Sequence, residues 1–459
     1  MPEQLTIQAY WNNTWHDTGQ VVLRSPEQGL TGSFQFYYAA HYINTADTFR
    51  PGMGFIDERS VGINLPGNFV RHFNERHIAP VLRDMIPQGS GRRALLKLWG
   101  EKDTGPGLDV RLLKEGCVSP IGNLRIKEAA ETFQDRISNQ EPAAFTRDNV
   151  SERNDELIEH AHNLGIAIGG ATGAGGDAPK LLMVEDDEGK LYLEGTIAES
   201  RIAQHWLIKF PRGRMLQDDE DILRAESVFY QTLEELGVNT IKGAHIQEGR
   251  VPALWMPRFD RAIVAGQVHR YGMESVYSLM RMVGDGARLQ HMDVLRQLTQ
   301  HLSANRDAIL VDYLLRDIIN SAIGNTDNHG RNTAIIKRDG ILELAPAFDL
   351  APMVLDREAI ARTTVWPKQL QQRDGVNYTA VLRELAGNPE GATKALIHRL
   401  ETLEDFRDRA IQNGLPDIAR DNPRINLDKF GQVARAIQNQ WRQAPDMDLD
   451  LDHYDGPTM

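Results

Sequence analysis

The stretch Ile323-Gly-Asn-Thr-Asp-Asn-His-Gly-Arg-Asn-Thr-Ala-Ile-Ile336 separates two segments of contrasting pattern. Before it, apolar residues recur at helical spacing and predict a helix over residues 308–323. After it, a β-branched run over residues 333–336 predicts a strand. The polar residues between Asp327 and Asn332 therefore occupy a loop that links a buried helix to a strand.

Ordinary turn chemistry is one explanation of this loop, because Asn, Asp, His and Gly are common in turns and caps. A calcium-binding loop is a second explanation, since Asn325, Asp327, His329 and Gly330 fall at its first, third, fifth and sixth positions. That alternative fails at position twelve, where Ile336 replaces the bidentate Glu that calcium loops require.

Phosphoryl transfer is the third explanation. An Asp followed five residues later by an Asn is the spacing of a protein-kinase catalytic loop, where the Asp orients the attacking hydroxyl and the Asn binds Mg²⁺. A second acid, Asp349, follows Asn332 by 17 residues, after another short apolar run. This order predicts a catalytic loop, a hairpin and then a metal-binding carboxylate.

The composition is that of a globular protein with two or three domains. The chain has 459 residues, of which 41% are hydrophobic and 25% are charged. Its net charge of −13 argues against a broad nucleic-acid-coating surface. The single cysteine, Cys117, excludes an internal disulfide and fits a reducing cytosol. With neither a signal segment nor an apolar run of membrane-spanning length, we expect a cytoplasmic protein.

A glycine-rich segment, Gly169 to Lys180, lies upstream, and five of its twelve residues are Gly. Such a segment allows backbone N–H groups to turn toward a phosphate. It is not a Walker A loop, because Pro179 precedes Lys180 and no Ser or Thr follows. It is not a dinucleotide fingerprint either, because a strand rather than a helix is predicted after it. A surface turn is the alternative.

Lys209 is a candidate phosphate-binding residue because it lies in the apolar strand predicted over residues 205–211. A helix predicted over residues 218–236 contains Glu226, and kinases pair such a lysine with a helix glutamate. The alternative is an edge strand on which Lys209 points to solvent.

The remaining pattern predicts an α+β protein with two lobes, β-rich first and mostly helical after residue 270. Residues 1–65 are expected to form strands with a turn at residues 16–19, and residues 101–122 a connector. Other expected strands cover residues 180–184, 190–193, 254–256 and 341–344. Expected helices cover residues 68–86 with a break at Pro80, 92–99, 151–164 with Ser151 as cap, 274–283, 292–303, 379–385, 393–403, 405–413 and 428–440. The acidic tail from residue 446 is expected to be disordered.

Several of these segments come in the order and approximate spacing of HipA-like serine/threonine kinases, the toxins of bacterial toxin–antitoxin pairs, which the chain resembles. They are the glycine-rich segment, residues 205–211, Arg258 to Arg261, Gly324 to Asn332 and Phe348-Asp349. The resemblance implies a two-lobed kinase-like fold. It divides the chain into an N-terminal subdomain (1–115), a kinase N-lobe (116–260), a helical C-lobe (261–445) and a tail (446–459).

The resemblance also implies an ATP and Mg²⁺ site. Asp327 would be the catalytic base, and Asn332 and Asp349 would bind Mg²⁺. Lys209 would contact the α- and β-phosphates. The remaining ATP-binding residues would be Gly175, Gly176, Asp177, Ala178, Pro179 and Lys180 over the nucleotide, Pro257, Arg258 and Phe259 around the adenine, His329, Gly330 and Arg331 beside the phosphates, and Phe348 packed against the site.

Regulation and partners are implied in the same way. The family's best-known member is phosphorylated on a serine of its glycine-rich loop, whereas here Thr172 is the only hydroxyl available there. The implied partner is a HipB-like helix-turn-helix antitoxin, through which the chain would meet DNA indirectly. The implied substrate is a protein, with an aminoacyl-tRNA synthetase as the family precedent. Two alternatives remain open: a catalytically weak module that docks the antitoxin on operator DNA, and a small-molecule kinase of similar architecture.

Overall fold

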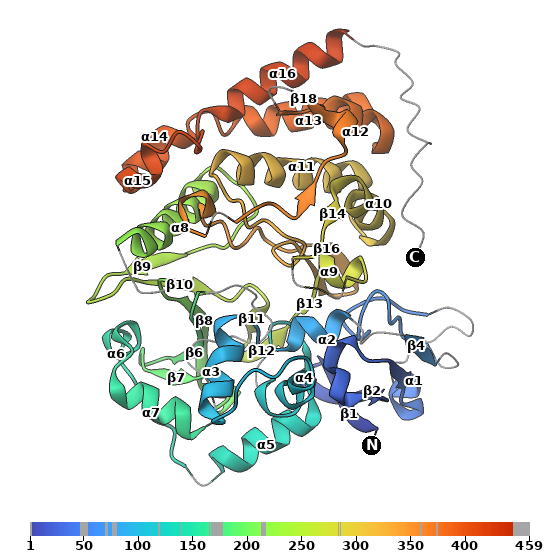
Figure 1. Ribbon diagram of the computed structural model, residues 1–459, viewed down its shortest axis with the longest axis vertical. Coiled ribbons are helices and arrows are strands. Elements are labelled where there is room, and N and C mark those ends of the chain that lie inside the picture. Colours follow the sequence, from blue (N-terminus) through green and yellow to red (C-terminus); the bar gives the residue numbers. More distant parts are fainter. Residues whose placement is uncertain are drawn as a thin grey trace.

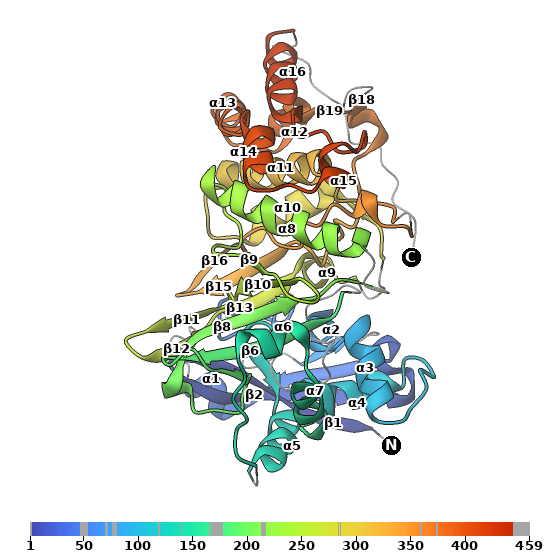
Figure 2. The same cartoon turned by 90° about the vertical axis from the view of Figure 1, so that its left-hand side faces the viewer.

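The computed structural model describes residues 2–45, 54–68, 72–75, 80–117, 120–138, 140–164, 166, 178–212, 217–282, 284, 286–358, 360–372 and 375–443. The two five-stranded sheets, with short helices around them, occupy the lower part of the molecule in Figure 1, and the C-terminal helices occupy the upper part. The side view shows the N-terminal sheet, the second sheet and the helices following one another along the long axis (Figure 2). The predicted α+β class, with a β-rich first part and a helical last part, is confirmed.

The N-terminal sheet has five strands in the order β4-β3-β2-β1-β5. They are β1 (Glu3–Trp11), β2 (Thr14–Leu23), β3 (Phe34–Tyr38), β4 (Phe73–Glu75) and β5 (Leu124–Ile126). The β1–β2 turn lies at Asn12 and Asn13, whose φ angles of 47° and 58° are left-handed. Asn tolerates this conformation in tight hairpins. The predicted turn at residues 16–19 is therefore wrong, because those residues lie within β2.

Short helices surround this sheet. They are η1 (Pro26–Thr31), α1 (Ala40–Thr45), α2 (Pro80–Met85), α3 (Ser90–Leu98), α4 (Leu108–Arg111), the π-helical turn η2 (Leu112–Gly116) and α5 (Lys127–Ile137). The helix predicted before Pro80 is wrong, since Phe73 lies in β4; Pro80 instead begins α2, where a missing N–H costs nothing. The predicted connector contains α4 and η2.

The second sheet has the order β7-β6-β8-β10-β9, with β8 in its centre. Its strands are β6 (Lys180–Asp186), β7 (Leu191–Leu193), β8 (Ile202–Lys209, preceded by η3, Glu199–Arg201), β9 (His245–Gln247) and β10 (Ala253–Pro257). Lys209 is paired with Lys180 on one side and with Leu254 on the other. The edge-strand alternative for Lys209 is thereby excluded.

Three helices accompany this sheet: α6 (Arg147–Glu152), α7 (Asp155–Asn163) and α8 (Gln217–Glu235). The single helix predicted over residues 151–164 is wrong. Thr146 caps α6 in a capping box, Arg153 ends it with a left-handed φ of 49°, and Asn154 caps α7. Ser151 is buried inside α6 and caps nothing. α8 packs against both β10 and the C-terminal helices (Figure 1).

The helical part contains α9 (Val276–Leu279), α10 (His291–His301), α11 (Arg306–Ala322), α12 (Tyr378–Leu385), α13 (Pro389–Glu401), α14 (Phe406–Gln412), α15 (Asp417–Arg420) and α16 (Lys429–Gln443), with short turns η4 (Met353–Leu355) and η5 (Lys368–Leu370). Its strands are β11 (Arg261–Val264), β12 (Gln267–Arg270), β13 (Gly272–Ser275), β14 (Leu289–Gln290), β15 (Ala334–Arg338), β16 (Ile341–Leu344), β17 (Thr364–Val365), β18 (Gln371–Gln372) and β19 (Gly375–Val376). The helix predicted over residues 274–283 begins as β13, because Ser275 pairs with Ala334.

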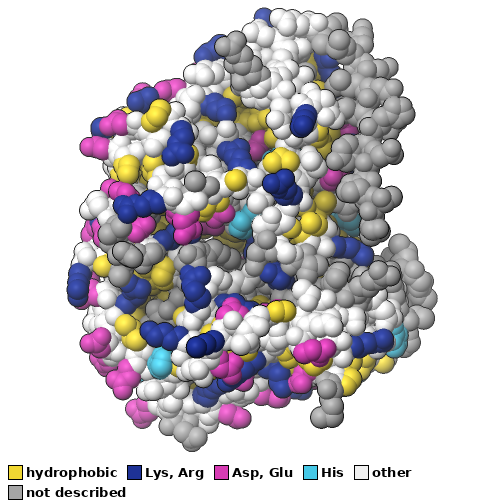
Figure 3. Space-filling model, viewed as in Figure 1, with side chains coloured by type: hydrophobic (Ala, Val, Ile, Leu, Met, Phe, Trp, Pro, Cys, Tyr) yellow, Lys and Arg dark blue, Asp and Glu magenta, His cyan; other side chains and the backbone are white. Residues whose placement is uncertain are grey.

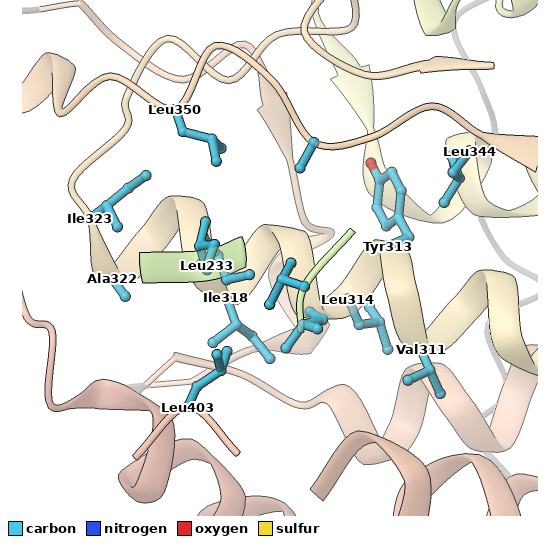
Figure 4. Packing of buried hydrophobic residues seen from close by; sticks show 14 of the residues in the cluster. Leu233, Val311, Tyr313, Leu314, Ile318, Ala322, Ile323, Leu344, Leu350 and Leu403 are labelled. Carbon is cyan, nitrogen blue, oxygen red and sulfur yellow. The ribbon is translucent and has the colours of Figure 1, made fainter. Parts of the chain in front are cut away.

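The core of the helical part is built on α11. Leu314, Ile318 and Ala322 of this helix belong to one buried cluster with Leu233 of α8 and Leu403 (Figure 4). Burial on this scale fixes the end of α11, and hence the start of the loop that follows.

The N-terminal sheet is fastened to both other parts of the molecule. The Gly122 N–H, just before β5, donates to Asp260 Oδ2 at 2.7 Å. Asn64 Nδ2 donates to the Ser278 carbonyl at 2.8 Å. The domain boundaries at residues 115, 260 and 445 stay predictions; the buried cluster of the N-terminal part extends as far as Ala129. Residues 446–459 lie outside the described part of the chain. Within that part no helix is both long and apolar enough to cross a bilayer.

Candidate active site

The loop after α11 is held by side-chain amides. Asn325 Nδ2 donates to Asn320 Oδ1 at 2.8 Å and to the Asp349 carbonyl at 2.9 Å, and its Oδ1 accepts from the Asp327 N–H. Asn332 Nδ2 donates to the Asp327 carbonyl at 2.8 Å. These bonds fix Asp327, Asn332 and Asp349 relative to one another, although 22 residues separate the first from the last.

Lys209 lies between two carboxylates. Its Nζ is 2.6 Å from Glu226 Oε2 and 2.8 Å from Asp349 Oδ1. The Tyr230 hydroxyl completes the group, donating to Glu226 Oε1 at 3.1 Å and accepting from the Asp349 N–H at 2.7 Å. The Lys209–Glu226 pair expected from the sequence is thus present, and it is buried, where an unpaired ammonium would be costly.

The surroundings shift the pKa values of Asp349 and Asp327 in opposite directions. Burial alone would raise the pKa of Asp349, but the Lys209 and Lys180 ammonium groups outweigh burial and hold this pKa below its usual range. Burial also raises the pKa of Asp327, and there the His329 ring, 3.9 Å away, offsets only part of the effect. Asp349 therefore gives up its proton more readily than an exposed aspartate, which suits a cation-binding role, whereas Asp327 holds its proton more tightly than an exposed aspartate.

A cavity opens beside these groups. Its apolar wall consists of Ile121, Leu207, Ile241, Met256, Pro257, Phe259, Met273, Ala334 and Phe348. The Phe259 and Phe348 rings lie 5.8 Å apart. Such walls fit a flat aromatic base.

A second, smaller cavity adjoins the first, and the two share Lys180, Lys209, Glu226 and Asp349. Its other polar lining residues are Arg212, Asp219 and Asp327. Three cations and several carboxylates therefore surround a space that continues from the apolar one, an arrangement that fits a phosphate chain with its metal.

Other predicted nucleotide residues take varied positions. Ala178 lines the second cavity and Lys180 lines both. The Pro179 carbonyl accepts a hydrogen bond from the Phe210 N–H. Pro257 and Phe259 form the apolar wall. Arg258 also lines the cavity, but its guanidinium is bonded to Glu194 and Asp260. Gly175, Gly176, Asp177 and Thr172 lie outside the described residues.

The residues between Asp327 and Asn332 make contacts that hold the loop in place. The His329 ring stacks on Tyr277 with centroids 5.8 Å apart. Gly330 lies so close to Tyr277 that a Cβ there would be 2.5 Å from the Tyr277 ring. Arg331 donates to Gln88 Oε1 of the N-terminal part and lines the larger cavity.

Sequence reasoning missed Tyr230, Arg212 and Asp84, all of which line these cavities. It also gave no role to Asn325, although the Asn-x-Asp spacing of residues 325–327 is the signal of a turn closed by the Asn side chain. Among the residues that the structure describes, no group of three or more His, Cys, Asp or Glu side chains could hold a metal ion. A metal here would rely on one carboxylate and one amide, namely Asp349 and Asn332.

Comparison with known proteins gives a family and a fold. Residues 172–408, just over half of the chain, match the model of the HipA-like C-terminal domain. The structure is similar to HipA of Shewanella oneidensis MR-1, solved with HipB and its operator DNA, with a TM-score of 0.57, 15% identity and coverage of 95% of this chain and 97% of that one. The Helicobacter pylori proinflammatory kinase CtkA gives a TM-score of 0.33 at 15% identity, over 56% of this chain and 97% of its own. No curated protein sequence matches the chain.

Proposed function

We propose that this chain, which belongs to the HipA-like family, is a Mg²⁺-dependent kinase that transfers the terminal phosphate of ATP to a serine or threonine of a protein. One observation carries the proposal: Lys209 joins Glu226 to Asp349 at the point where an apolar cavity meets a charged one that contains Asp327. These are the groups that phosphoryl transfer needs, because its transition state spreads charge over phosphate oxygens.

The donor set fits a magnesium ion. Lys209 contacts Oδ1 of Asp349 and Asn332 uses its Nδ2 toward Asp327, so a carboxylate oxygen and an amide oxygen remain for the metal. Oxygen ligands of this kind suit Mg²⁺. When bound, Mg²⁺ would neutralise charge on the phosphate oxygens. Lys209 and Lys180 would add two further positive charges.

Asp327 would act as the base. As the substrate hydroxyl oxygen forms its bond to the terminal phosphorus, Asp327 accepts the hydroxyl proton, and the bond from that phosphorus to the bridging oxygen breaks to release ADP. Because burial raises its pKa, this carboxylate is a stronger base than an exposed aspartate.

The decisive experiment incubates the purified chain and a clarified bacterial extract with γ-labelled ATP and Mg²⁺. We expect acid-stable label in phosphoserine or phosphothreonine, and a loss of about 10²–10⁴-fold in Asp327→Asn. Asp339→Asn is the matched control, because Asp339 is exposed on the β15–β16 turn and Asn also adopts its left-handed φ. Label in Asp327→Asn within about threefold of the parent, far short of that loss, contradicts the assignment. Label confined to small molecules supports a small-molecule kinase, and no label despite nucleotide binding supports a binding module.

We also propose that the chain is the toxin of a pair whose second member is a HipB-like helix-turn-helix protein acting on operator DNA. The support is family membership and a fold shared with a HipA solved with HipB and DNA. The face seen in Figure 3 carries both cationic and anionic side chains. Expression should arrest growth, and both Asp327→Asn and co-expression of the antitoxin should restore it. An aminoacyl-tRNA synthetase is the substrate class to examine first.

A further inference from the structure

One end of the larger cavity is supplied by the N-terminal part of the chain. Asp84, in the last turn of α2, accepts from the Ser275 N–H at 2.9 Å through Oδ2 and from the Ser275 hydroxyl at 2.8 Å through Oδ1. Asp84, Ser275 and Arg331 all line the same cavity as the apolar wall and Lys209.

One part of a nucleotide has no protein partner assigned so far. The apolar wall around Met256 and Phe348 accounts for the base, and Lys209 with Asp349 accounts for the phosphates. The remaining part is the sugar, which carries hydroxyl donors. Arg331 connects the phosphate side of the site to Asp84. It directly precedes the proposed metal ligand Asn332 in the sequence, and its positive charge acts to lower the pKa of Asp84.

A carboxylate is the right acceptor for such hydroxyls. It has about four acceptor positions and no donor, so the two bonds from Ser275 leave capacity for a sugar hydroxyl. Burial raises the pKa of Asp84 because the group is shielded from water, and a hydrogen bond made in that setting counts for more than one made at the surface.

We infer that Asp84 is a specificity-determining residue that accepts a hydrogen bond from a ribose hydroxyl of the nucleotide, so that the N-terminal part of the chain selects ribonucleotides over deoxyribonucleotides. The inference rests on the proposed function, since it requires ATP in this cavity.

Calorimetric titration of the full chain with Mg²⁺ and ATP, 2′-deoxy-ATP or 3′-deoxy-ATP tests the inference. A hydrogen bond to a charged group implies that the parent binds ATP at least about 10-fold more tightly than one of the deoxy nucleotides. In Asp84→Ala the affinity for ATP should fall by a similar factor, while the affinity for that deoxy nucleotide stays nearly unchanged. The ratio between the two nucleotides therefore collapses toward one.

Asn64→Ala is the matched control. Asn64 also docks the N-terminal part on the helical part, through the Ser278 and Leu279 carbonyls, but it does not line the cavity. This variant should keep the parent ratio even if it loosens the docking. If Asp84→Ala does not fold, Asp84→Asn, which keeps the shape but loses the charge, should lower the ratio in the same direction.

The outcomes separate the two ideas. A parent ratio near one for both deoxy nucleotides, or a ratio that Asp84→Ala leaves unchanged, overturns the role of Asp84 while ATP binding stands. A folded parent that binds none of the three nucleotides overturns the proposed function, and the role of Asp84 with it.

Discussion

Lys209 lies 2.8 Å from Asp349, so one ion pair joins the central strand of the second sheet to the loop that follows β16. Asp349 adopts a left-handed φ of 56°, which is unusual for a residue other than glycine. The bonds from its N–H to Tyr230 and from Asn325 to its carbonyl hold the residue in that conformation. The position of the carboxylate proposed to bind the metal is thus set from both halves of the kinase-like region.

Lys209→Met should destabilise the protein by about 3–5 kcal/mol, because it leaves Glu226 and Asp349 as buried charges without their cation. Urea denaturation of the nucleotide-free chain measures this. Lys394→Met is the control: the Lys394–Glu390 pair is largely exposed, and its loss should cost no more than about 1 kcal/mol. Equal shifts in the two variants would mean that the buried pair contributes no more than a surface pair.

Magnesium should increase the stabilisation that ATP confers. A ligand at about 100 times its dissociation constant stabilises the folded state by about 2.7 kcal/mol, which appears as a raised melting temperature. Asp349→Ala should abolish the increment due to Mg²⁺, whereas Asp339→Asn should preserve it. An undiminished increment in Asp349→Ala would place the metal elsewhere.

Asp327→Asn should stabilise the nucleotide-free protein at pH 7 by about 0.5–2 kcal/mol, the range of single stabilising substitutions. The sign follows from the pKa of Asp327, which burial raises in the folded state. The folded protein therefore binds this proton more tightly than the unfolded chain does, and ionisation at rising pH lowers stability. The gain should shrink as the pH falls toward about 4, the pKa of an unfolded aspartate. If Asp327→Asn is less stable than the parent at pH 7, burial of the ionised Asp327 carboxylate does not destabilise the folded protein as predicted.

Thr172 should be the residue modified if the glycine-rich segment is autophosphorylated. A phosphate would add about −1.5 to −2 charges, which would repel the ATP phosphates and lower ATP affinity if the segment covers the nucleotide as expected. Mass spectrometry after incubation with Mg-ATP, with Asp327→Asn as the inactive control, tests the modification. An unmodified Thr172, together with parent-like ATP binding by Thr172→Asp, would exclude this switch.

Local patterns pointed to several residues that the structure brings together around the two cavities. Lys209 stands out as a cation in an apolar strand, and Asp327 and Asn332 are identified by spacing alone. Asp84 and Tyr230 could not be found this way, because their partners lie 191 and 119 residues away in the chain, beyond any periodicity. Contacts of that kind are set by how sheets and helices pack, and a single sequence does not display them.

The errors in secondary structure have a similar cause. Apolar residues continue at helical spacing through residues 151–164, yet the helix breaks where Arg153 turns left-handed and Asn154 caps a new one. The pattern of apolar residues in a sequence does not reveal that one residue adopts a left-handed backbone conformation. Residues 274 and 275 likewise become a strand because β15 offers backbone partners, which a local pattern does not reveal.

The N-terminal part of the chain is attached to both sides of the larger cavity, through the bond from Gly122 to Asp260 and the bonds from Ser275 to Asp84. In enzymes whose substrates are enclosed, opening and product departure often limit turnover. Any opening here that separates Asp260 from Ser275 must break one of these attachments. If the cavity holds a nucleotide as proposed, the rate at which spent nucleotide leaves would depend on these attachments. A protein bound to the N-terminal part would then slow turnover by hindering this opening, without occupying the nucleotide cavity.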